Sequence, residues 1–155
     1  MIRRLAVTCL AIAAVGWSAT GAVSDPPPER SELTVETTEG HRHRFLVEVA
    51  RSQRQLAVGL MFRRQLAGDA GMLFDFGVER PVSMWMKNTL LPLDMIFIRG
   101  DGRIANVAER TVPGSLQPHA SMGAVRGVLE VNGGTVDRLG IKVGDRVIHD
   151  MFDRE

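Results

Sequence analysis

Hydrophobic and polar residues alternate along several short segments of this chain, a period typical of β-strands that bury one face. The first two such segments are residues 33–37 and 45–49, and Glu39 and Gly40 supply a turn between them. This arrangement predicts a β-hairpin over residues 32–50. A sheet should therefore begin near the start of the folded part.

Further strand-like segments follow, separated by glycine-containing turns, and they cover residues 71–76, 82–87, 93–98, 104–108, 127–131 and 143–148. Helix signals are few. Ser52 and Gln55 form a capping-box pattern that predicts one short helix to about residue 61, and Thr135 precedes a single helical turn. Many short strands and one real helix predict a mainly β fold, a β-sandwich or a jelly-roll-like curled sheet.

The N-terminus has the pattern of a secretory signal peptide over residues 1–22. Arg3 and Arg4 precede an apolar run at 5–17, and small residues follow at 18–22. A run of about 13 residues is shorter than the roughly 20 that a membrane span requires, so we expect cleavage and no lasting membrane anchor. The mature protein should be periplasmic or secreted.

Composition narrows the remaining possibilities. Residues 23–31 are rich in proline and predict an extended spacer, which leaves residues 32–151 as a single β-rich domain. Cys9, the only cysteine, lies in the expected signal, so the mature domain has neither a disulfide nor a thiolate nucleophile. From residue 23 onward, 17 Lys and Arg face 18 Asp and Glu, a net charge of −1. That balance gives no support for nucleic-acid binding.

One run, residues 81–98, places polar groups among apolar residues and is the strongest candidate for a site. If residues 82–87 form a strand that continues to Thr89, the side chains of Trp85, Lys87 and Thr89 share one face. An indole beside an ammonium and a hydroxyl can stack on a sugar or an aromatic ring and form hydrogen bonds to its edge. The expected ligand contacts are Trp85, Lys87, Asn88 and Thr89, with Asp94 and Glu130 as acceptors.

Three other interpretations remain open. In the first, Trp85 fills the core and Lys87 pairs with Asp94 or Glu130. In the second, an acid–base pair of Asp94 and Glu130 serves a hydrolase-like enzyme, provided that the fold brings the two carboxyls together. In the third, the domain handles copper(I) through Met84 and Met86, because thioethers are soft ligands, and His119 would be the third ligand.

Five motifs are similar to those of the family known as domain of unknown function 192. They are Gly59-Leu60-Met61-Phe62-Arg63, Gly71-Met72-Leu73-Phe74, Trp85-Met86-Lys87-Asn88-Thr89, Pro92-Leu93-Asp94, and Val128-Leu129-Glu130-Val131 with its glycine-rich continuation to Ile141. The resemblance covers roughly residues 45–148 and implies a compact, mostly β fold of sandwich or jelly-roll-like type, but no activity. This chain has Val58 where relatives commonly carry a basic residue.

Taken together, these patterns predict an exported β domain that binds a small polar ligand, such as a carbohydrate, or a protein partner. A non-catalytic role without a cofactor is the expected function, because no nucleophile motif or metal-ligand spacing is present.

Overall fold

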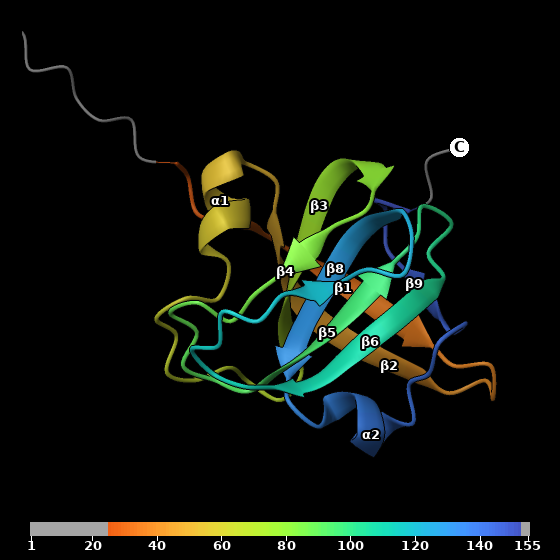
Figure 1. Cartoon of the computed structure of the whole chain (residues 1–155). Helices are drawn as coiled ribbons and strands as arrows, with labels where there is room; N and C mark the ends of the chain where they lie inside the picture. The colour runs from red at the N-terminus through yellow and green to blue at the C-terminus, as the bar shows by residue number, and fades with distance from the viewer. Residues whose placement is uncertain (1–24, 153–155) are drawn as a thin grey trace, which may run out of the picture.

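The computed structural model describes residues 25–152, so the expected signal peptide lies outside the described residues. Figure 1 shows a mainly β molecule with two short helices, which confirms the expected fold class. The strands are β1 (Glu29–Glu36), β2 (Arg42–Ala50), β3 (Ala70–Arg80), β4 (Ser83–Met84), β5 (Leu93–Ile98), β6 (Ile104–Thr111), β7 (His119–Ala120), β8 (Val125–Asn132) and β9 (Arg146–Ile148). The helices are α1 (Gln53–Val58) and α2 (Thr135–Leu139).

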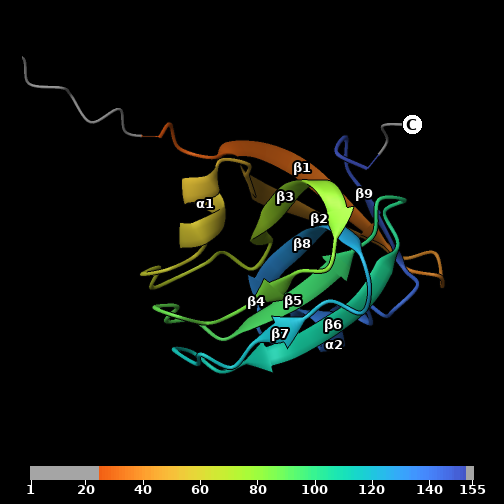
Figure 2. The same ribbon diagram turned by 45° about the horizontal axis from the view of Figure 1, so that its top comes forward.

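Seven strands form one sheet in the order β6-β5-β8-β3-β2-β1-β9, and β4 pairs only with β7. The large sheet curls until its two edge regions meet, as Figure 2 shows. An isolated bridge joins Arg103, just before β6, to Arg146 of β9. Hydrogen bonds of 2.9 Å from the N–H of Ile104 to the carbonyl of Asp145 and 2.8 Å from the N–H of Val147 to the carbonyl of Gly102 close this end of the curl.

Both faces of the central strands β3, β5 and β8 are covered. One face contributes Leu73, Ile96 and Leu129 to a core with residues of β1 and β9. The other contributes Met72, Met95 and other residues to a second core that packs under α1, β4 and the segments around them. Burial on both faces explains why β5 is a continuous apolar run apart from Asp94. No helix within residues 25–152 is long and apolar enough to cross a membrane.

Several expected boundaries move in the structure. Residues 29–31 belong to β1, where Glu29 pairs with Val49, so the extended spacer is shorter than expected. The segment expected as a strand over 82–87 is a strand only at Ser83–Met84. Beyond it the N–H of Thr89 bonds to the carbonyl of Met86 at 3.0 Å. Residues 86–89 thus form a turn, so the side chains of residues 85–89 do not alternate between two faces of a strand as the sequence suggested.

Helix α1 confirms the predicted capping box. The Ser52 hydroxyl accepts a hydrogen bond from the N–H of Gln55, and the Gln55 side chain accepts one from the N–H of Ser52, both at 3.1 Å. The helix ends at Val58 rather than near residue 61, because Gly59 adopts a φ of 51°. The expected helical turn is present as α2, but Thr135 is its first residue and does not cap it, because Gly134 occupies the N-cap position. The structure therefore has two short helices rather than one.

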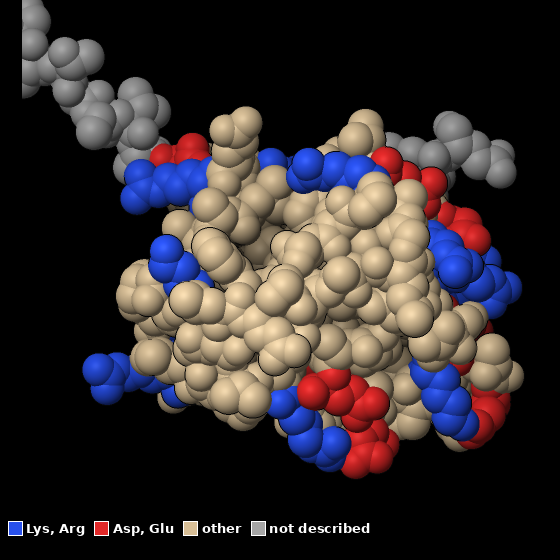
Figure 3. All heavy atoms as spheres, viewed as in Figure 1, with Lys and Arg blue, Asp and Glu red and all other residues tan. Residues whose placement is uncertain are grey.

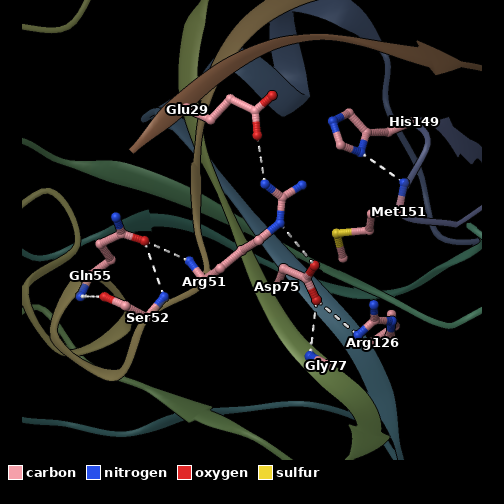
Figure 4. A network of polar contacts seen from close by, with 9 residues as sticks. All are labelled: Glu29, Arg51, Ser52, Gln55, Asp75, Gly77, Arg126, His149 and Met151. Carbon is pink, nitrogen blue, oxygen red and sulfur yellow. Dashed lines mark hydrogen bonds and ion pairs between the residues drawn. The ribbon is translucent and has the colours of Figure 1, made fainter. Parts of the chain in front are cut away.

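A polar network anchors α1, which has no buried residue of its own. Figure 4 shows Arg51, directly before the helix cap, between two carboxylates. Its guanidinium lies 2.8 Å from Glu29 and 3.4 Å from Asp75 of β3, and Arg126 of β8 lies 2.8 Å from the same Asp75. Ion pairs thus hold the start of α1 against β1, β3 and β8, and this fixes the position of the residues that follow it.

Candidate ligand-binding site

A cavity of about 190 Å³ opens beside α1, over strands β3 and β8. In Figure 3 the middle of the same face is hollowed and carries no charged side chain, and Lys, Arg, Asp and Glu gather around its rim. The lining comes from α1 and the segment after it, from β3, from β4 with the residues that follow, and from β8. It consists of Leu56, Ala57, Val58, Gly59, Leu60, Met61, Phe74, Phe76, Ser83, Met84, Trp85, Thr89 and Glu130.

Glu130 is the acidic group in this lining. It lies in β8 directly opposite Met72 of β3 and Met95 of β5, so it shares the face of the sheet that carries the second core. The residue is only 4% exposed, and no group within residues 25–152 forms a hydrogen bond or an ion pair with its carboxyl. Burial raises the pKa of Glu130 to about 8. The carboxyl is therefore mostly protonated at neutral pH.

Trp85 lies at the mouth of the cavity and is 50% exposed. The interpretation that Trp85 fills the core is therefore wrong, and the fully buried Met86 is the residue that enters the core. The ammonium of Lys87 lies 5.2 Å from the centroid of the indole ring, a cation–π distance. Lys87 pairs with the ring rather than with Asp94 or Glu130.

Thr89 and Asn88 belong to the turn that closes one side of the cavity. Thr89 is buried and lines the cavity, and its hydroxyl donates to the carbonyl of Lys87 at 3.3 Å. Asn88 has a φ of 54°, a left-handed conformation that asparagine tolerates better than most residues. Its backbone carbonyl accepts a hydrogen bond from the backbone N–H of Phe62 at 2.9 Å. Asn88 thus joins this turn to the segment after α1 but is not part of the lining.

Asp94 is not part of the cavity. It is completely buried, and its carboxylate accepts hydrogen bonds of 2.7–3.0 Å from three backbone N–H groups, those of Arg110, Gly134 and Val136. Two of these groups belong to the start of α2. The side chain thus satisfies helix N–H groups that would otherwise lack partners.

The two carboxyls that could have formed an acid–base pair lie on opposite faces of the sheet. Asp94 pairs across the strands with Val131, and Glu130 pairs with Met95, the residue after Asp94. Because side chains alternate between faces, Asp94 and Glu130 point in opposite directions. The interpretation of these two residues as a catalytic carboxylate pair is therefore wrong.

The structure brings together only two of the three residues considered as copper ligands. Met84 and His119 are direct partners in the β4–β7 ladder. The Nε2 atom of His119 is buried and has no hydrogen-bond partner among the described groups. Met84 packs against the second core and Met86 lies within it. Within residues 25–152, no cluster of three or more His, Cys, Asp or Glu could hold a metal ion.

The cavity also contains residues that strand periodicity could not identify. Met61, Phe74 and the three α1 residues Leu56, Ala57 and Val58 line it. Two of the family-like motifs did point to these residues. Gly59-Leu60-Met61 and Gly71-Met72-Leu73-Phe74 both contribute residues to the lining of the cavity. A Cβ atom on Gly59 would lie 2.9 Å from the Phe74 ring, so glycine is needed for this close approach.

The fold and the cavity define a small domain of a curled seven-stranded sheet and a two-stranded one, with a mostly apolar cavity on the outer face of the large sheet. The model of the DUF192 family, described as "Uncharacterized ACR", matches residues 34–149. The chain therefore belongs to this family, as its motifs suggested. No curated protein matches the sequence.

Two crystal structures share the fold. One is a candidate transcription regulator from Sinorhizobium meliloti 1021, with 48% sequence identity and a TM-score of 0.78 over 81% of this chain and 97% of that one. The other is a protein of unknown function from Novosphingobium aromaticivorans DSM 12444, with 39% identity and a TM-score of 0.76 over 86% of this chain and all of that one.

Proposed function

We propose that this domain binds a small, largely apolar molecule in the cavity between α1 and β8. The observation that carries the proposal is Glu130, a buried carboxyl that borders the cavity and has no partner among the described residues. Because this carboxyl opens on the cavity without a protein partner, a ligand in the cavity can form a hydrogen bond with it. A concave apolar wall with one such polar group is typical of small-molecule sites.

The composition of the wall argues for binding of an apolar body rather than a sugar. Ser83, Thr89, Glu130 and the indole N–H of Trp85 are the polar groups that side chains bring to the lining, and Thr89 already donates its hydroxyl hydrogen to the protein. A sugar carries hydroxyls around its whole ring and would leave several of them unpaired here. The volume of about 190 Å³ also suits a ligand smaller than a typical drug.

The same composition supports binding rather than catalysis. Glu130 has no second acid or base beside it in the lining, and general acid–base chemistry usually needs a positioned partner. Export, proposed from residues 1–22, would place this binding site in the periplasm or outside the cell.

Thermal-shift measurements with small apolar alcohols, amines, monosaccharides and nucleosides test the proposal. A ligand at 100 times its dissociation constant adds about 2.7 kcal/mol to the free energy of unfolding and raises the melting temperature. Trp85→Ala should weaken binding of the hit about tenfold, because the indole forms the mouth of the cavity. Val143→Ala is the control, since this apolar side chain is 62% exposed and does not line the cavity.

An equal effect of the two substitutions would place the ligand elsewhere, and a panel without any stabilising compound would contradict the proposal. Trp85 fluorescence gives a second measurement at the site. Trp17, the other tryptophan, lies within the proposed signal peptide, so Trp85 would be the only fluorescent indole of the mature domain.

Copper(I) binding is a second candidate, supported by the pairing of Met84 with His119 and by the buried, unpaired Nε2 atom. A thioether and an imidazole are suitable ligands for Cu(I). Stabilisation by Cu(I) that is lost in both Met84→Leu and His119→Gln would favour this function. Stabilisation that persists in both variants would contradict it.

A further inference from the structure

The charges around the cavity restrict the class of ligand that it can take. Glu130 is the one ionisable group in the lining formed by the described residues. The lining therefore has no basic side chain that could pair with an anionic ligand. The surrounding elements carry ionisable side chains that do not line the cavity, including Arg54, Asp75, Arg80, Lys87, Asp94 and Arg126. An anionic ligand would thus lose its hydration in the cavity without gaining an opposite charge from the lining, which is unfavourable.

Aromatic rings and thioethers surround this carboxyl. Phe74, Phe76 and Trp85 contribute rings to the lining, and Met61 and Met84 contribute polarizable sulfur atoms. The negative face of an aromatic ring attracts cations, and cages of such rings bind quaternary ammonium groups. The ammonium of Lys87, 5.2 Å from the Trp85 centroid, already makes this kind of contact from outside the lining.

We propose that the cavity binds a small organic cation, an amine or a quaternary ammonium compound, whose charge pairs with the Glu130 carboxylate while its alkyl groups contact the aromatic and thioether wall. This inference rests on the proposed ligand-binding function and names the ligand class. A neutral ligand could form a hydrogen bond to Glu130, but a cation gains ion pairing and cation–π attraction as well.

The pairing couples binding to release of a proton. Glu130 faces Met72 from β3 and Met95 from β5, and burial alone raises its pKa to about 8. A permanently charged ligand requires the ionised carboxylate, so below about pH 8 the proton must leave when the ligand binds. Affinity should therefore increase about tenfold from pH 6 to pH 7 and become constant above about pH 9.

Choline and its neutral isostere 3,3-dimethylbutan-1-ol test the inference by isothermal titration calorimetry on the purified protein at pH 6, 7 and 8.5. Choline should bind more tightly at each higher pH, and the alcohol should bind with the same affinity throughout. Glu130→Gln should weaken choline binding about tenfold or more at pH 8.5 and change binding of the alcohol less than about twofold. Lys87→Met should strengthen choline binding, because it removes a nearby like charge.

Glu32→Gln, the same chemical change at an exposed position of β1, is the control and should leave every affinity unchanged. Thermal melting of Glu130→Gln checks that the variant folds. Binding of the alcohol but not of choline would overturn the cation inference and leave the proposed function intact. Binding of neither compound, together with a panel that gives no hit, would overturn both.

A phospholipid headgroup carries the same cation as free choline. Sedimentation with phosphatidylcholine vesicles distinguishes the two sources. Capture of the protein by these vesicles without measurable binding of free choline would overturn the assignment to a small soluble ligand.

Discussion

At the scale of single residues, Glu130 shows how one buried carboxyl affects the whole domain. The residue is 4% exposed, and burial raises its pKa to about 8 in the folded state. In the unfolded chain the same group has a pKa of about 4.3. Between these values the folded state holds a proton that the unfolded state has lost. The free energy of unfolding should therefore fall as pH rises through this window.

Glu130→Gln should remove this pH dependence. The wild-type protein should lose at most about 1.4 kcal/mol per pH unit from about pH 5 to pH 8, and the slope of the variant should be smaller by that amount. Urea unfolding at several pH values, with Glu32→Gln as the exposed control, measures both slopes. Equal slopes for the wild type and Glu130→Gln would show that Glu130 does not titrate in this range.

At the scale of elements, both short helices depend on polar groups for their position, although α2 also buries Val136 in the first core. Helix α1 has no buried residue and is anchored by its capping box and by the ion pairs of Arg51. Helix α2 begins at Thr135, and the N-cap residue Gly134 has no side chain to cap it. The buried Asp94 instead accepts hydrogen bonds from the N–H groups of Gly134 and Val136. One of these polar arrangements shapes the cavity, and the other stabilises the opposite face of the sheet.

Asp94→Ala tests whether Asp94 stabilises the fold without contributing to the cavity. The substitution leaves three backbone N–H groups without their acceptor, and two of the three bonds are at the buried or partly buried start of α2. We expect a loss of about 3 kcal/mol in the free energy of unfolding, measured by urea denaturation, with unchanged affinity for a cavity ligand. A large loss of affinity in a variant that is still folded would mean that Asp94 contributes to the site.

At the scale of the whole molecule, the C-terminal segment completes the core inside the curled sheet. Met151 and Phe152 are buried there together with strand residues such as Leu33 and Leu129. Gly127 of β8 makes room for Met151, because a Cβ atom at this position would overlap the Met151 methyl group and lie 2.7 Å from the carbonyl oxygen of Phe74. A residue late in the chain is thus packed against the middle of the sheet.

Gly127→Ala should therefore destabilise the domain by about 1–3 kcal/mol, since a backbone atom cannot move as easily as a side-chain end. Gly68→Ala is the matched control, because nothing lies within 4 Å of its Cβ position, and it should change the free energy of unfolding by less than about 0.5 kcal/mol. Similar melting temperatures for the two variants would show that the C-terminal segment shifts to accept the methyl group.

The sequence by itself determined the local structure. Alternating residues and glycine-containing turns predicted most strands, and Ser52 with Gln55 predicted the start of α1, because these features depend on neighbours along the chain. Of the six expected ligand contacts, Trp85, Thr89 and Glu130 line one cavity, which Lys87 and Asn88 do not line although they belong to the same segment. Whether these residues bind a ligand stays a prediction.

Only the tertiary structure decided where each polar side chain lies. Asp94 and Glu130 occur in similar apolar runs, but the strand register places one at the start of α2 and the other beside the cavity. Trp85 could equally have entered the core, and the turn at 86–89 leaves it half exposed at the mouth. These outcomes depend on contacts between segments far apart in the chain, and local periodicity contains no information about such contacts.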